Sequence, residues 1–162
     1  MPIGNGDIGL NVWVEEDSDL FFYISKTDAW SENARLLKLG RVRVKISPNP
    51  FLKGMPFLQT LKLRSGEIEI RAGKEDSKLT LRIWVDANQP VIRLEVEGEQ
   101  NFETRVILEL WRNKERILAG DELYSAYGMS NAPHPVIVHP DTILPIEDNS
   151  IVWFHRNKAS IW

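Results

Sequence analysis

A strict alternation of apolar and polar residues is the feature that most constrains the fold of this chain. Residues 79–86 carry leucine, isoleucine or valine at every odd position and polar residues or tryptophan at the even positions. After the turn Ala87–Pro90 the pattern resumes with Ile92, Leu94 and Val96. Successive side chains of a strand point to opposite faces, so a period of two indicates a half-buried strand. The segment therefore predicts two neighbouring antiparallel strands.

The same period recurs in residues 8–15, 41–46 and 102–111, and residues 20–24 form a further, mostly apolar strand. No long amphipathic helix is predicted, and only residues 112–123 contain a plausible helical turn. Residues 25–32 are expected to leave the sheet as a loop. Residues 124–149 are expected to be irregular apart from a short strand at 136–138, and residues 151–155 form a last strand. The predicted fold is an all-β, mainly antiparallel β-sandwich.

Residues 61–71 allow a register to be predicted. If Ser65-Gly66 is a two-residue hairpin loop, Leu63 lies opposite Ile68 and Lys62 lies opposite Glu69. Apolar pairs then share one face and ion pairs the other, and a slip of one residue would bury the charges. Leu63 is therefore expected in the core.

Composition narrows the classes of function. A chain of 162 residues is expected to form one domain, 1–162, or part of a larger one. Its net charge of −3 argues against nucleic acid and anionic membrane partners. Without cysteine it has no disulfide and no thiolate nucleophile. No apolar run is long enough to span a bilayer, and because the sequence opens directly into a predicted turn, we expect no signal peptide within these residues.

Two surface features leave alternatives open. The row Arg41, Arg43 and Lys45 either binds acidic sugars or is a solvated face balanced by acidic neighbours, which is the commoner arrangement. Trp13, Trp84 and Trp111 lie opposite the apolar stripes of their strands. They either stack on sugar rings or are buried under a covered outer face.

No residue set has a spacing that defines an active site. The histidines are His134, His139 and His155, and they match no zinc-ligand pattern, so neither a metal nor another cofactor is predicted. Glycosidases use two carboxylates, but neighbours such as Asp28 with Glu32 or Glu147 with Asp148 arise by chance in a chain with 23 acids. No catalytic residue is therefore assigned.

Several segments, taken in order, resemble a known family. PIGNGDIGL at the start, and KTDAWSE after one further strand, resemble the opening of glycoside hydrolase family 95 enzymes, the α-L-fucosidase and α-L-galactosidase type. Glu32 stands where that family has glycine. The likeness extends through residues 39–44, 84–87 and 153–157. The chain is most similar to an uncharacterised N-terminal domain on such bacterial hydrolases.

The resemblance implies a supersandwich domain of the galactose-mutarotase-like kind, which precedes an (α/α)6 barrel that holds the catalytic carboxylates. It implies a non-catalytic domain that braces this barrel, in a periplasmic or extracellular enzyme of polysaccharide degradation. Residues expected to contact carbohydrate or the neighbouring domain are Asn5, Asp28, Trp30, His155 and Asn157.

Two other functions remain open, a free-standing carbohydrate-binding module and a purely structural or assembly domain. An accessory domain that is removed from its barrel leaves apolar surface uncovered. The isolated chain is then expected to form a homodimer through residues 124–162.

Overall fold

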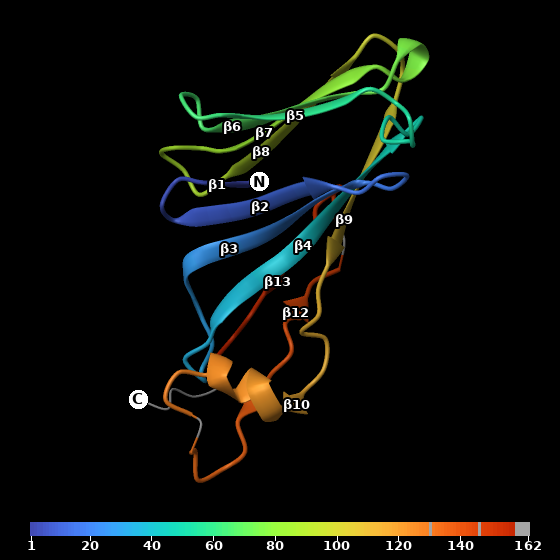
Figure 1. Ribbon diagram of the computed structural model, residues 1–162. Helices are drawn as coiled ribbons and strands as arrows, with labels where there is room; N and C mark the ends of the chain where they lie inside the picture. Colours follow the sequence, from blue (N-terminus) through green and yellow to red (C-terminus); the bar gives the residue numbers. More distant parts are fainter. Residues whose placement is uncertain (130, 146, 158–162) are drawn as a thin grey trace. The chain divides into compact units, whose positions relative to one another are not determined.

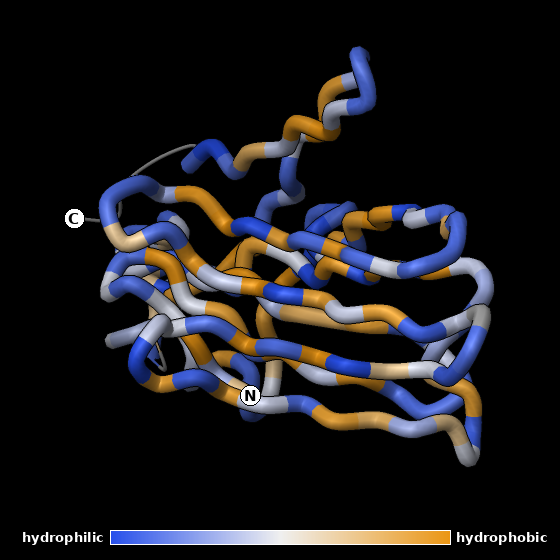
Figure 2. The backbone as a smooth tube through the Cα atoms, turned by 90° about the horizontal axis from the view of Figure 1, so that it is seen from above, coloured by the Kyte–Doolittle hydropathy of each residue, from blue (hydrophilic) through white to orange (hydrophobic). Residues whose placement is uncertain are grey.

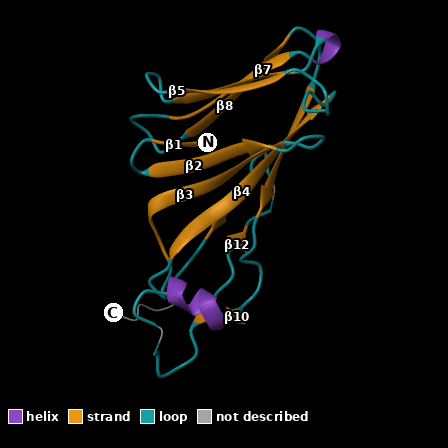
Figure 3. Ribbon diagram, in the orientation of Figure 1, coloured by secondary structure: helices purple, strands orange, loops and turns teal. Residues whose placement is uncertain are grey.

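The computed structural model describes residues 1–129, 131–145 and 147–157, which divide into two compact units. The first unit comprises Met1–Thr27 and Leu39–Glu109, and the second comprises Asp28–Lys38 and the chain from Leu110 onward. Helix in the described residues is limited to two short 3-10 turns, η1 (Glu75–Ser77) and η2 (Gly120–Ser125) (Figure 3). Neither turn is long and apolar enough to cross a membrane.

Two antiparallel sheets make up most of the structure (Figure 1). The five-stranded sheet has the order β1-β2-β3-β4-β9, with strands Pro2–Gly4, Ile8–Val14, Leu20–Trp30, Leu36–Ser47 and Glu103–Glu109. The four-stranded sheet has the order β5-β6-β7-β8, with strands Phe57–Lys62, Glu67–Ala72, Leu79–Val85 and Ile92–Gly98. This architecture confirms the predicted all-β, mainly antiparallel β-sandwich.

The core of the first unit comes from the apolar stripes of these strands. Figure 2 shows the stripes as alternating orange and blue segments along the chain. In β7 the predicted inward residues Leu79, Leu81, Ile83 and Val85 are all buried. Strand β4 likewise buries Val42, Val44 and Ile46. The period of two therefore identified the buried face of each of these strands correctly.

The loop of the β5–β6 hairpin differs from the prediction. Lys62 lies opposite Glu67 and Leu61 opposite Ile68, so the loop has four residues, 63–66, and the register is displaced by two. Leu63 is 84% exposed, and its predicted place in the core is wrong. A two-residue turn needs either positive φ at both central residues or glycine at the first. Ser65-Gly66 offers glycine only at the second position, where Gly66 has φ +66°.

The start of the chain is also more regular than predicted. Pro2–Gly4 is an edge strand that pairs with β2, and β3 continues to Trp30, where a loop was expected from Ser25 onward. Polar side chains do not end a strand whose backbone still has partners. Lys26 lies opposite Ile8 in the ladder, and the backbone N–H of Thr27 donates to the Asp7 carbonyl at 3.0 Å.

The second unit contains short elements with their own small core. Its strands are β10 (Arg116–Ile117), β11 (Ile137–Val138), β12 (Thr142–Ile143) and β13 (Trp153–Phe154). They pair as two antiparallel ribbons, β10 with β11 and β12 with β13. A buried cluster is formed by Leu118, Ala126, Val136 and Val138. The short strands predicted at 136–138 and 151–155 are thus present, in shorter form.

Candidate functional site

Charged side chains from four separate segments of the second unit meet in what we call the charged cluster. Glu32 follows β3, Arg112 follows β9, His139 follows β11, and Asp141 precedes β12. His155 follows β13. Each residue lies just beyond a strand end, where the backbone is free to leave the ladder direction. Such positions are where proteins commonly place functional groups.

Arg112 and Asp141 form the most buried part of the cluster. The guanidinium donates Nε–H to Oδ1 and Nη2–H to Oδ2, both at 2.8 Å, and Nη1–H to the Lys38 carbonyl at 2.6 Å. The two side chains are only 6% and 1% exposed. The backbone N–H of Asp141 donates in return to the Arg112 carbonyl at 2.8 Å. This bidentate geometry offsets the desolvation free energy that is lost when the two charges are buried.

His155 extends the network from Asp141 to Glu32. Its Nδ1 lies 3.0 Å from Asp141 Oδ1, and its Nε2 lies 3.1 Å from Glu32 Oε2. A neutral imidazole carries only one N–H. Both contacts can be hydrogen bonds only if the ring carries two protons or one of the carboxyl groups carries one. The arrangement therefore holds the His155 ring in one orientation between two acids.

His139 lies on the other side of Glu32. Its Nδ1 is 3.0 Å from Glu115 Oε2, and its Nε2 is 3.6 Å from Glu32 Oε1. That oxygen is buried, in a side chain that is only 7% exposed, and it has no hydrogen-bond partner among the described residues. With both rings neutral, the carboxylates of Glu32, Asp141 and the neighbouring Glu115 leave two negative charges that the Arg112 guanidinium does not balance. With both rings doubly protonated, the charges balance.

The hollow over the charged cluster excludes a sugar. It is lined by cluster residues together with Ser31, Leu37 and Val138, and it has no room for a water molecule. A glycosidase needs two carboxyl groups roughly 5–10 Å apart across a pocket that holds a sugar ring. Among the described residues, no three His, Asp or Glu side chains are arranged to hold a metal ion. The cluster therefore acts here as an electrostatic crosslink between chain segments.

Four of the five predicted contact residues lie in the second unit. His155 belongs to the charged cluster. Asn157 Nδ2–H donates to the Trp30 carbonyl at 3.2 Å, and the Trp30 side chain is 51% exposed. Asp28 is exposed on β3, two residues before Trp30.

Asn5 lies in the first unit and has a structural role there. Its Oδ1 accepts from the backbone N–H groups of Asp7 and Ile8 at 3.0 and 2.8 Å. Its Nδ2–H donates to the Asp86 carbonyl at 2.7 Å. Because Asp86 follows β7, this amide joins the turn between β1 and β2 to the other sheet.

Sequence reasoning did not assemble the charged cluster, because Glu32, Arg112 and Asp141 are far apart in the chain. No sequence motif singles out Arg112, and proximity in the chain pairs Glu32 only with Asp28. The one available signal was that Glu32 replaces a glycine of the resembled motif, since a carboxylate in that position needs a partner. His134 is not part of the cluster; it lines a separate hollow of about 300 Å³ beside Leu118 and Val136.

Two of the three residues of the basic row on β4, Arg41 and Arg43, are balanced by acidic neighbours. Arg41 and Arg43 each donate Nε–H to Glu109, at 2.5 and 2.6 Å, and both guanidinium groups lie over the Phe21 ring. Burial of Glu109 raises its pKa, but the hydrogen bonds from the two arginines outweigh this and hold the pKa below its ordinary value. These two arginines are therefore structural, which is the commoner of the two alternatives.

Trp13 packs on the same face of the five-stranded sheet. Its ring stacks on Phe21 with centroids 5.5 Å apart and is tilted against Tyr23 at 4.9 Å. Its Nε1–H donates to Glu15 at 3.1 Å. Trp13 therefore packs within an aromatic cluster with Phe21 and Tyr23. Trp111, in the second unit, is a large exposed apolar side chain.

The fold and the charged cluster together define an antiparallel β-sandwich module with a buried electrostatic crosslink and no sugar-sized catalytic hollow at that cluster. The chain belongs to the DUF5703_N family, described as a domain of unknown function (DUF5703), which matches residues 1–162. This confirms the expectation of an uncharacterised N-terminal domain family, while no link with glycoside hydrolase family 95 is shown. No curated protein and no solved structure matched the chain.

Proposed function

We propose that this chain is the non-catalytic N-terminal β-sandwich domain of a family-95-like glycoside hydrolase. Its role is to brace the catalytic (α/α)6 barrel of the same polypeptide and to line one rim of the sugar pocket. The motif resemblance at residues 2–10 and 26–32 supports the family context. Membership of an N-terminal domain family supports the expectation of a further domain.

The observation that carries the proposal is the uneven exposure of apolar side chains. Of the seventeen large apolar side chains that are exposed among the described residues, eleven belong to the second, smaller unit. Tyr124 and Tyr127 are both 77% exposed, and Phe154 and Trp111 are nearly half exposed. Exposed apolar residues in such numbers are typical of a surface that another domain covers. Residues 158–162, at the end of the segment predicted to dimerise, lie outside the described residues.

The charged cluster supports the non-catalytic part of the proposal. Asp141 accepts from Arg112 and faces His155, and Glu32 lies between two histidines. These acids are occupied within the domain and have no space for a substrate beside them. We expect the purified chain to hydrolyse neither aryl α-L-fucosides nor aryl α-L-galactosides. Turnover that persists through purification and is lost with Glu32→Gln would overturn the proposal.

The bracing role is tested by Phe154→Ser in the longer polypeptide that carries this domain. We expect its melting temperature to fall by about 2–4 °C, because an apolar contact worth about 1 kcal/mol is lost in a large protein. The same substitution in the isolated chain should leave melting unchanged, since Phe154 is exposed there.

Leu63→Ser is the matched control, because Leu63 is exposed on the hairpin loop of the first unit. It should change neither melting temperature. Equal losses for Phe154→Ser in the long and the short protein would mean that Phe154 serves only its own domain. Saturable binding of a sugar by the isolated chain would favour a carbohydrate-binding module instead.

A further inference from the structure

The first unit contains a preformed hollow beneath the loop between β4 and β5. The loop is attached to the turn between β2 and β3 by three hydrogen bonds. Asn49 Nδ2–H donates to the Ser18 carbonyl at 2.9 Å, the Asp17 N–H donates to the Phe51 carbonyl at 2.9 Å, and the Lys53 N–H donates to Asp17 Oδ1 at 2.6 Å. Walls held in this way lose little freedom when a ligand binds.

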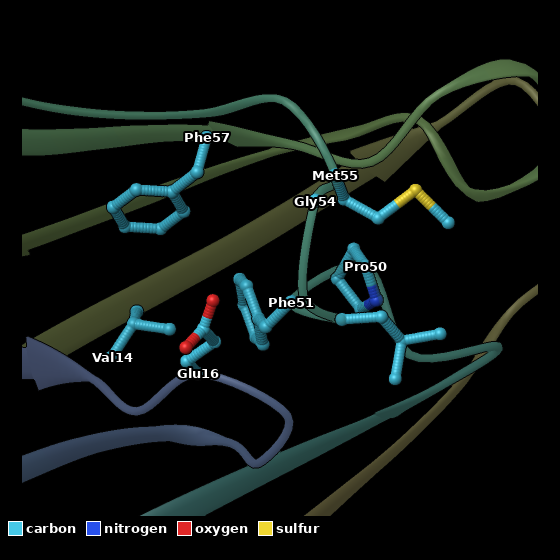
Figure 4. A pocket seen from close by; sticks show the side chains of 8 residues that line it. Val14, Glu16, Pro50, Phe51, Gly54, Met55 and Phe57 are labelled. Carbon is cyan, nitrogen blue, oxygen red and sulfur yellow. The ribbon is translucent and has the colours of Figure 1, made fainter.

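The hollow has aromatic walls and the size of a small ligand. Its volume is about 230 Å³, and Phe51, Phe57 and Met55 line it (Figure 4). The two phenylalanine rings meet edge to face with centroids 6.3 Å apart. An apolar cavity of about 150 Å³ holds benzene. The larger volume therefore admits a six-membered ring with a short chain attached.

One carboxylate is placed at this aromatic hollow. Glu16 lines it, and in Figure 4 one of its oxygens points toward the space between Phe51 and Phe57. No hydrogen bond or ion pair to the Glu16 carboxylate is found within the described part of the chain. A negative charge beside aromatic faces attracts a cation, because the face of an aromatic ring is itself the negative end of a quadrupole.

We propose that this hollow binds a small organic cation, an ammonium group that carries an aromatic or alkyl substituent. The substituent fills the space beside Phe51 and Met55. The ammonium lies near Phe57 and pairs with the Glu16 carboxylate. Apolar walls with one placed charge are the usual composition of a small-molecule site. A neutral analogue of equal size lacks the charge interactions and binds more weakly, and an anion is repelled.

The test observes the three methionine methyl groups by NMR after ¹³C-methyl labelling of the chain. Only Met55 lines the hollow, so Met1 and Met129 serve as internal references. The probes are 2-phenylethylammonium and the neutral 2-phenylethanol. We expect saturable movement of the Met55 signal with the ammonium. The alcohol should bind about fivefold more weakly, the factor that about 1 kcal/mol of charge interaction produces.

Glu16→Gln should lower the affinity for the ammonium about fivefold and leave that for the alcohol unchanged. Glu99→Gln is the control, because it removes the same charge from an exposed turn after β8. Unmoved Met1 and Met129 signals in each variant show that the fold is retained. The proposal is overturned if Met55 does not respond, if both probes bind equally, or if Glu16→Gln binds the ammonium as well as the parent chain does.

Discussion

Arg112 shows how much of the second unit depends on one buried charge. Its guanidinium is the only positive group of the charged cluster that does not depend on a histidine proton. It faces Asp141, which is almost fully buried. A carboxylate in such a place is tolerated only while its partners remain. Removal of the Arg112 guanidinium therefore lowers the free energy of unfolding by more than the ion pair with Asp141 contributes to it.

Replacement of Arg112 by methionine is expected to destabilise the chain by about 3–5 kcal/mol. The substitution keeps a long side chain but leaves Asp141 buried beside His155 without its guanidinium. Urea unfolding at neutral pH measures the loss. Arg105→Met is the control, since Arg105 pairs with Glu103 in an exposed position, and it should cost no more than about 1 kcal/mol. A loss below about 1 kcal/mol for Arg112→Met would show that water or rearrangement satisfies Asp141.

At the scale of elements, the β5–β6 hairpin shows that a sequence pattern predicts which residues share a face of the sheet but does not predict the length of the loop. Burial decides which alternate residues of each strand point to the core, so Leu61 and Ile68 share a face as expected. The length of the loop follows from the φ angles that its residues accept, and two registers of the same parity differ little in buried area. Lys62 contacts both Glu67 and Glu69, at 2.9 and 2.5 Å, so the predicted ion pairing did not discriminate between the registers.

The four-residue loop makes Gly66 more important than Leu63. Gly66→Ala should destabilise the chain by about 1–2 kcal/mol, because an L-residue at φ +66° is strained even though its Cβ meets no neighbour. Leu63→Ala should change stability by less than about 0.5 kcal/mol, since its side chain is exposed. Chemical unfolding of the two variants decides between the registers. If Leu63→Ala lowers the free energy of unfolding more than Gly66→Ala does, the register with the two-residue loop is supported instead.

At the scale of the molecule, local pattern accounts for the sandwich but not for the charged cluster. Buried stripes such as that of β7 repeat within a few residues and can be read directly. Glu32 and His155 meet across 123 positions of sequence, and no period relates them. The second unit was predicted as mainly irregular because its strands have only two residues each. Its order comes from long-range ion pairs and a small core.

The two units should therefore differ in local stability. The core of the second unit is centred on four buried residues, whereas in the first unit several strands each bury a whole apolar stripe, as β7 does with Leu79, Leu81, Ile83 and Val85. Amide hydrogen exchange is expected to be slowest in β6 and β7 and much faster in β12 and β13, because local opening follows the amount of buried apolar contact. Mass spectrometry of exchanged peptides measures this. Equal protection of β7 and β13 would mean that the charged cluster compensates for the small core.

The side-chain amide of Asn5 also affects the rate at which the chain is deamidated. An asparagine followed by glycine is the dipeptide most prone to lose its side-chain amide, because the unhindered next backbone nitrogen attacks the side-chain carbonyl. In the folded chain this carboxamide is held by hydrogen bonds with Asp7, Ile8 and Asp86, which restrict the rotation that attack by the Gly6 nitrogen requires. The product would carry a carboxylate where the Asp86 carbonyl needs a donor. Folding therefore protects a side-chain amide whose slow conversion to a carboxylate would remove the hydrogen bond from Asn5 to the Asp86 carbonyl, which links the two sheets at this turn.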